Sequence, residues 1–219
     1  MQRLWISLIR FGFRLLYNEF AWTYDWVSKA VSFGQWRCWG QQALRHLDAP
    51  PGAPVLEIAH GTGNIQLDLL AAGYDVTGVD LSPHMGRIAA TRLKRHKQPI
   101  RLARANAAAL PFPNAAFAAI ACTFPAPFIL EANSLREAHR VLRPGGRLVI
   151  VPNAVLTGGD PATAAVELLY RLTGQRGQEG FDAVAHFARH GFSARLVTEQ
   201  CKRSVVMVII AERVNGEEN

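Results

Sequence analysis

The chain has 219 residues, of which 49% are hydrophobic and 19% are charged, and it carries a formal net charge of +7. This composition excludes an intrinsically disordered chain and supplies enough apolar residues for one α/β domain with a sizeable core. The cysteines, Cys38, Cys122 and Cys201, are scattered and show no Cys-x-x-Cys spacing. That pattern argues against a metal site and against a disulfide framework, and it leaves a reducing cytoplasm as the default compartment.

The first 17 residues are apolar and aromatic, with Arg3, Arg10 and Arg14 on one helical face. The stretch is too short and too interrupted to span a membrane, and it lacks the small residues of a signal-peptide cleavage site. Two interpretations stay open. The stretch forms a helix that packs over the domain as a lid, which we favour, or a helix that lies in a membrane interface and makes the protein membrane-associated.

Four of the five tryptophans lie between Trp22 and Trp39. Their density predicts either an aromatic wall or a small satellite core under the lid. We expect residues 1–50 to form an N-terminal helical segment that covers the substrate. A proline-rich linker then leads into the main domain, residues 51–219.

A short apolar run, Val55–Ala59, is followed by Gly61 and Gly63. This pattern predicts a buried parallel strand that turns sharply into a helix, because glycine tolerates positive φ and lets a ligand approach the backbone. We expect Asn64 to cap that helix. Glu57 lies near the end of the strand, where open α/β sheets bind ligands.

The second expected strand, residues 75–80, ends in Asp80, about 20 residues after the glycine turn. A carboxylate at this position can accept hydrogen bonds from both hydroxyls of a ribose. The glycine spacing does not complete a dinucleotide fingerprint, since Gln66 stands where the third glycine would be. Together with the acid Glu57, this pattern favours a nucleoside that carries an amine and a sulfonium over one that carries phosphates.

At this point the sequence resembles the class I S-adenosylmethionine-dependent methyltransferases, whose first motif is an acid followed by G-x-G-x-G. The stretch VLEIAHGTG matches this motif except that Ala59 replaces the first glycine. The resemblance implies S-adenosylmethionine as the cofactor. It also implies a Rossmann-like, seven-stranded, mostly parallel sheet of order 3-2-1-4-5-7-6 with helices on both faces. It covers residues 54–153 well and the termini weakly.

The N-terminal segment loosely resembles the quinone-biosynthesis methyltransferases. In those proteins Y-D, S-x-G and W-R recur, and here they are Tyr24-Asp25, Ser32-Phe33-Gly34 and Trp36-Arg37. The resemblance implies a small-molecule or lipid-like acceptor.

After the second strand, Asp80, Ser82 and Met85 match the family string D-x-S-x-x-M. Ser82 is a favourable N-cap, and Pro83 suits the first helical position. The resemblance implies that Leu81 and Met85 contact the adenine with apolar surface.

The segment 106–114 resembles the family's D-A-x-x-L-P-F-x-D, with Asn106 in place of the usual aspartate. An amide oxygen can accept a hydrogen bond from the adenine amine, but the loss of charge assistance costs on the order of 1 kcal/mol. Further strands are expected at 100–105 and 117–124, and L-R-P-G-G is expected to turn into a fifth. The runs 194–202 and 204–213 predict an antiparallel C-terminal hairpin.

The motifs and the expected strand ends together predict three groups of site residues. The expected cofactor-binding residues are Glu57, Ala59, Gly61, Gly63, Asp80, Leu81, Met85, Asn106, Ala107 and Thr123. The expected acceptor pocket is walled by Trp22, Trp26, Phe124 and Phe128. The candidate catalytic residues are Tyr24 and His60, with His186 as a further candidate base.

These features predict in-line transfer of a methyl group to a small, apolar or lipid-like acceptor, with the protein chiefly positioning the reactants and excluding water. Two alternatives stay open. The departures at Ala59, Asn106 and Ala118 motivate a protein that keeps the fold without the activity. The basic run from Arg87 to Arg104 motivates an RNA methyltransferase. We favour a solvated helix face for that run, because no aromatic residues interleave with it, so nucleic acid is not an expected partner.

Overall fold

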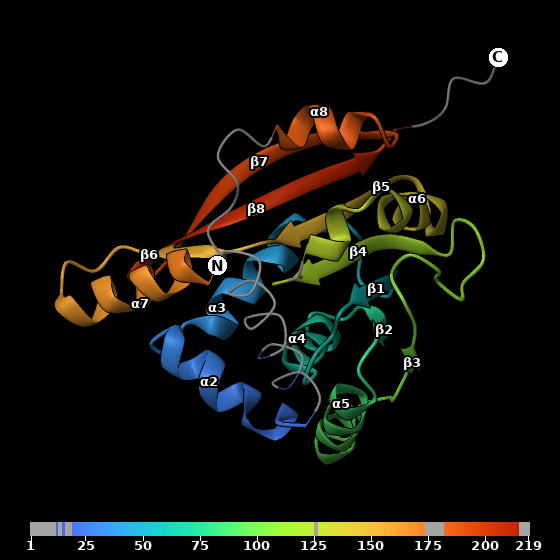
Figure 1. Ribbon diagram of the computed structural model, residues 1–219. Coiled ribbons are helices and arrows are strands. Elements are labelled where there is room, and N and C mark those ends of the chain that lie inside the picture. Colours follow the sequence, from blue (N-terminus) through green and yellow to red (C-terminus); the bar gives the residue numbers. More distant parts are fainter. Residues whose placement is uncertain (1–11, 13–14, 16–18, 125–126, 174–181, 215–219) are drawn as a thin grey trace.

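The structure is a computed structural model, in which residues 12, 15, 19–124, 127–173 and 182–214 are described (Figure 1). Apart from residues 12 and 15, the predicted helix over the first 17 residues lies outside the described part, as does the glycine-rich loop 174–180. Among the described residues, no helix is long and apolar enough to cross a membrane.

The described strands form one eight-stranded mixed sheet. Its order is β3-β2-β1-β4-β5-β8-β6, and β7 pairs with β8 outside this path. The strands are β1 (Pro54–Ile58), β2 (Asp75–Asp80), β3 (Leu102–Arg104), β4 (Phe117–Thr123), β5 (Leu142–Val151), β6 (Ala154–Leu156), β7 (Phe192–Cys201) and β8 (Ser204–Arg213). The first five are parallel, and β8 runs antiparallel to each of its neighbours.

The predicted fold class, a Rossmann-like and mostly parallel sheet that ends in an antiparallel hairpin, is confirmed. The expected count of seven strands misses β6, which pairs with the first residues of β8. Three residues are too few to show the alternation that identifies a strand in a sequence. Since β7 pairs along the whole of β8, β5 and β6 share the opposite edge of that strand.

The helices lie on both faces of the sheet (Figure 1). The α-helices are α2 (Tyr24–Val31), α3 (Trp36–Gln41), α4 (Asn64–Ala71), α5 (Pro83–Arg95), α6 (Ala132–Val141), α7 (Pro161–Leu172) and α8 (Ala183–Ala188). The 3-10 helices are η1 (Ala21–Thr23), η2 (Gln42–His46) and η3 (Pro127–Leu130). As predicted, Ser82 caps α5 by accepting a hydrogen bond from the backbone N–H of Met85, with Pro83 at the first position.

Each face of the sheet has its own core, because successive strand residues point to opposite sides. Leu56 and its counterparts on one face pack under α6 and α8. Val55 and its counterparts on the other face pack under α3, η2 and α4, where Trp39 and Leu47 are fully buried. The part of the N-terminal segment from α3 onward is therefore built into the helix layer, and covering of the substrate by residues 1–50 stays a prediction.

The cysteine spacing led to a wrong expectation. Cys38 of α3 and Cys201 at the end of β7 form a disulfide across 163 residues, and Cys122 is a buried free thiol. Beside this bond, the Trp39 indole N–H donates to the Ser204 hydroxyl at 2.6 Å. Pairing over such a span depends on packing and leaves no spacing signal. The cytoplasmic location stays a prediction, and the disulfide removes the cysteine argument for it.

Candidate active site

A cavity of about 410 Å³ lies at the carboxyl ends of β1 and β4, under α2 and α3. This is the edge at which open α/β sheets bind ligands. The lining includes seven of the predicted site residues: Tyr24, Glu57, Ala59, His60, Gly61, Thr123 and Phe124.

The loop that leaves β1 has a left-handed backbone at three positions. Gly61 and Gly63 have φ of +53° and +81°, and Ala59 has φ of +58°. A Cβ on Gly63 would come within 3.0 Å of the Ala89 Cβ, so glycine lets the loop approach α5 closely. Gly63 also occupies the N-cap position expected for Asn64, whose side chain bonds elsewhere. Ala59 holds a conformation that costs a non-glycine residue roughly 1 kcal/mol or more.

The Asp80 carboxylate closes this loop onto β2. One oxygen accepts the backbone N–H of Gly61 at 2.9 Å, and the other accepts the backbone N–H of Ser82 at 2.8 Å. A carboxylate has about four lone-pair positions, so two remain for further donors. Asp80 therefore orders the loop and keeps the capacity to accept the two hydroxyls of a ribose.

Glu57 is a buried acid that faces the cavity without a full set of partners. Its side chain is 1% exposed, and its Oε2 atom has no hydrogen-bond partner among the described residues. Burial raises the pKa of Glu57 well above its ordinary value, and the nearby carboxylates of Asp80 and Asp68 raise it further. A cationic group bound in the cavity would supply the missing partner and favour the ionised acid.

His60 is also buried beside the loop. Its Nδ1 atom lies 2.9 Å from the carbonyl oxygen of Gly61, so Nδ1 carries the proton that it donates. Burial lowers the pKa of His60, and the Asp80 carboxylate opposes that effect. The geometry therefore favours a neutral imidazole with Nε2 as its acceptor.

Three aromatic side chains form the wall on the β4 side. The Phe124 ring stacks on the Trp36 ring with centroids 4.0 Å apart, and Tyr24 meets Trp36 edge-on at 6.3 Å. The expected wall differs from this one. Trp22 and Trp26 are 72% and 75% exposed on the outer side of η1 and α2, away from the cavity lining.

Phe128 also lies outside that lining and packs on the core under α6. Trp36, one of the four clustered tryptophans but not one of the expected pocket residues, takes the place expected for these side chains. The tryptophan density predicted aromatic surface, but which tryptophan faces inward depends on how the two helices are rotated.

Asp25 joins three elements and was missed as a site residue. Its carboxylate accepts the Thr62 hydroxyl at 2.7 Å and the Asn64 amide at 3.1 Å, and it forms an ion pair with Arg92 of α5. Arg92 also donates to the Thr62 carbonyl oxygen at 2.8 Å. A side chain of α2 thus holds the glycine loop and α5 together. The only sequence signal for it was the Tyr24-Asp25 pair.

The residues expected near adenine lie outside the cavity lining. Met85 is 1% exposed and belongs to the interior, and Ala107 is part of the core. Leu81 is 61% exposed, next to the end of β2. The Asn106 side-chain oxygen accepts the backbone N–H of Ala108 at 3.0 Å, although a carbonyl oxygen keeps a second lone pair.

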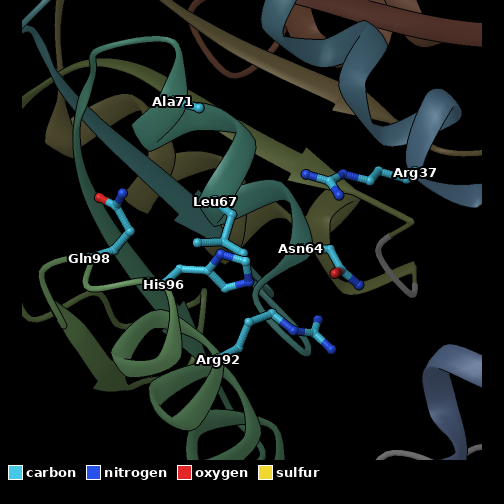
Figure 2. A pocket seen from close by; sticks show the side chains of 7 residues that line it. All are labelled: Arg37, Asn64, Leu67, Ala71, Arg92, His96 and Gln98. Atoms are coloured by element: carbon cyan, nitrogen blue, oxygen red, sulfur yellow. The ribbon is translucent and has the colours of Figure 1, made fainter.

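A second cavity, of about 300 Å³, lies beside the first between α3, α4 and α5 (Figure 2). Arg37 and Asn64 line both cavities. Two arginines reach it, but each already has a carboxylate, Arg37 that of Asp68 at 2.6 Å and Arg92 that of Asp25. The positive charges of Arg37 and Arg92 are therefore paired within the protein.

Some arginines of the basic run on and after α5 also bond to other groups of the protein. Arg101 forms an ion pair with Asp75, and the Arg104 guanidinium donates to the Leu81 carbonyl oxygen at 3.1 Å. Two of the seven basic residues in this run, Arg92 and Arg101, are thus paired with carboxylates.

A model of the ubiE/COQ5 methyltransferase family matches residues 13–158, more than half of the chain. The chain belongs to this family. A demethylmenaquinone methyltransferase of Thermus thermophilus is 35% identical over 74% of the chain and 72% of its own length. A ubiquinone/menaquinone biosynthesis C-methyltransferase of Syntrophotalea carbinolica is 34% identical over 72% of the chain and 66% of its own length.

A demethylmenaquinone methyltransferase of Tropheryma whipplei is 38% identical over 63% of the chain and 57% of its own length. The chain thus spans less than two thirds of the length of several curated relatives that it matches.

Solved structures share the fold at low identity. A geranyl diphosphate C-methyltransferase from Streptomyces coelicolor matches with a TM-score of 0.62 and 15% identity, over 81% of this chain and 79% of that one. A phosphoethanolamine N-methyltransferase from Haemonchus contortus matches with a TM-score of 0.62 and 14% identity, over 83% of this chain and 53% of that one. Family membership confirms the predicted class of enzyme, a methyltransferase that uses S-adenosylmethionine, and these neighbours confirm its fold.

Proposed function

We propose that this methyltransferase moves the methyl group of S-adenosylmethionine to a ring carbon of a quinol-like acceptor with an apolar tail. The observation that carries the proposal is the cavity itself. It places the buried acid Glu57 and the glycine loop opposite an aromatic wall made by Trp36 and Phe124. Two family relatives are named demethylmenaquinone methyltransferase and ubiquinone/menaquinone biosynthesis C-methyltransferase, and these names support this class of acceptor.

The residues in and next to the cavity have separate tasks in this proposal, and Asp80, which does not line the cavity, acts from the end of β2 next to the glycine loop. Asp80 accepts the ribose hydroxyls with its remaining lone pairs, and Glu57 pairs with the ammonium group of the donor. Because the rings of Trp36 and Phe124 stack on each other, a flat acceptor would pack against the side of this pair that lines the cavity. The sulfonium is already an activated donor, so the protein supplies orientation and excludes water.

A quinol ring carbon becomes a stronger nucleophile when the neighbouring hydroxyl loses its proton. The carbon would then bond to the methyl group as the sulfonium C–S bond breaks, and loss of the proton on that carbon would restore the aromatic ring. His60 and Tyr24 are the candidates for accepting that proton, because both line the cavity. The neutral imidazole of His60, protonated at Nδ1, has Nε2 as its acceptor. We propose that α2, held by Asp25 on the glycine loop, acts as the lid over the bound reactants.

Two measurements on the purified chain test the proposal. Isothermal titration with S-adenosylhomocysteine should give saturable binding, and radiolabelled donor should label a short-chain demethylmenaquinol. Absence of S-adenosylhomocysteine binding at millimolar concentration would instead indicate a fold without the activity. Donor binding without labelling of any quinol would overturn the acceptor assignment. A salt-sensitive gel shift with RNA would favour the nucleic-acid alternative.

A further inference from the structure

Exposed apolar side chains occur on α2, on the residues that flank it, and on the neighbouring helix α7. We define the α2–α7 face by Trp22, Trp26, Phe33, Leu168, Leu169 and Leu172, whose exposed fractions lie between 46% and 75%. The two helices are neighbours, because the Tyr170 hydroxyl of α7 donates to the carbonyl oxygen of Val31 at the end of α2 at 3.1 Å (Figure 1). A surface patch of large apolar side chains marks a site that interacts with a protein or a membrane.

The charged residues that α2 and α7 expose are cations, whereas the exposed Glu19 precedes η1 and Asp160 caps α7 in an ion pair with Arg203. Each helix has one acid, and both acids are turned inward. Asp25 bonds to Thr62 and Arg92, and Glu167 accepts the backbone N–H of Leu156 at 2.9 Å. The remaining exposed residues of the two helices are apolar except for the cations Arg171 and Lys29, and Lys29 also lines the cavity.

We propose that the α2–α7 face docks on an anionic lipid bilayer. Tryptophan and leucine side chains enter the boundary between head groups and acyl chains, and cations beside them are attracted to anionic lipids. The formal net charge of +7 gives the whole chain the complementary sign. The first 17 residues precede η1 in the sequence and combine apolar side chains with three arginines, a composition similar to that of the α2–α7 face.

Helix α2 contributes to both the α2–α7 face and the cavity, so docking could deliver an acceptor to the site. This part of the inference rests on the proposed function. The inner side of α2 contributes Tyr24, Ser28 and Lys29 to the cavity lining, while its outer side carries Trp26. Docking would therefore place one wall of the cavity against lipid. An acceptor with an apolar tail could then move from the bilayer into the site without exposing that tail to water.

Vesicle co-sedimentation of the full chain tests the docking without donor or acceptor. Wild type should bind phosphatidylcholine vesicles that contain phosphatidylglycerol and should bind pure phosphatidylcholine far less. The double substitution Trp22→Ser with Trp26→Ser should lower the partition coefficient at least about tenfold. Arg171→Gln should lower it roughly fivefold, the effect of one cation near a charged surface.

A matched control keeps the test specific. Ile100→Gln and Leu196→Gln change side chains that are 50% and 45% exposed elsewhere on the chain, and they should bind vesicles like wild type. Calorimetry with S-adenosylhomocysteine checks that every variant keeps the donor site.

Equal vesicle binding by the tryptophan variant and the control would overturn the proposal. So would a dimer, seen by light scattering without lipid, that the tryptophan variant abolishes, because the face would then serve a second copy. Vesicle binding together with failure to methylate any quinol would leave the docking intact and reject only the proposed acceptor.

Discussion

Replacing Asp80 with asparagine tests the donor site at its most constrained position. Both carboxylate oxygens already accept a backbone N–H, from Gly61 and Ser82. An asparagine amide can keep one of these bonds, but its NH₂ group must then face the other N–H, donor against donor. The variant therefore loses one bond that orders the glycine loop, and it also loses the negative charge that would hold the ribose.

The expected size follows from these bonds. The remaining amide oxygen is a neutral acceptor, which weakens one ribose bond by about 1–1.5 kcal/mol, and the NH₂ group cannot accept, which removes the other bond, worth about 1.5–3 kcal/mol. The sum of about 3 kcal/mol corresponds to a roughly hundredfold higher Kd for S-adenosylhomocysteine. The lost loop bond should lower the free energy of unfolding by about 1–3 kcal/mol.

Isothermal titration and urea unfolding measure the two effects separately. Asp75→Asn is the control, because Asp75 opens the same strand and its ion pair with Arg101 is half exposed. That pair contributes about 1 kcal/mol at most, and its loss should leave the Kd unchanged. If Asp80→Asn binds S-adenosylhomocysteine as tightly as Asp75→Asn does, Asp80 does not hold the ribose and the assignment of the site is refuted.

Three further predictions follow from buried groups. Because burial raises the folded-state pKa of Glu57 above its ordinary value of 4.5, the free energy of unfolding should fall as pH rises from that value toward the raised pKa. Urea unfolding at several pH values should show this fall for wild type and not for Glu57→Gln, and parallel curves would contradict it. Gly78→Ala should destabilise by about 1–3 kcal/mol in the same assay, because its Cβ would meet Leu102 at 2.9 Å and the buried Gln66 side chain still closer, and a change below about 0.5 kcal/mol would reject this packing. Cys38→Ser should lower the free energy of unfolding by up to about 5 kcal/mol, given a loop of 163 residues. Reduced wild type should unfold like that variant, and indifference of wild type to reductant would show that the bond is absent.

The central βαβ unit was predictable from the sequence because its signals are local. A short apolar run, two glycines and an acid at the end of the next strand each follow from neighbouring residues. They predicted the left-handed loop at Gly61 and Gly63, and they predicted that Asp80 would lie beside it. The cap at Ser82 was predictable for the same reason, since capping involves residues three positions apart.

The features that the sequence did not predict, or predicted wrongly, all depend on packing between distant segments. Trp36 faces the cavity and Trp26 faces outward because of how α2 and α3 are rotated against the sheet, and both are equally aromatic in the sequence. The bonds of Asp25 to the glycine loop and of Cys38 to Cys201 join residues that are 37 and 163 positions apart. Spacing along a chain carries no information about such contacts, because they arise only when helices and strands have been packed against one another.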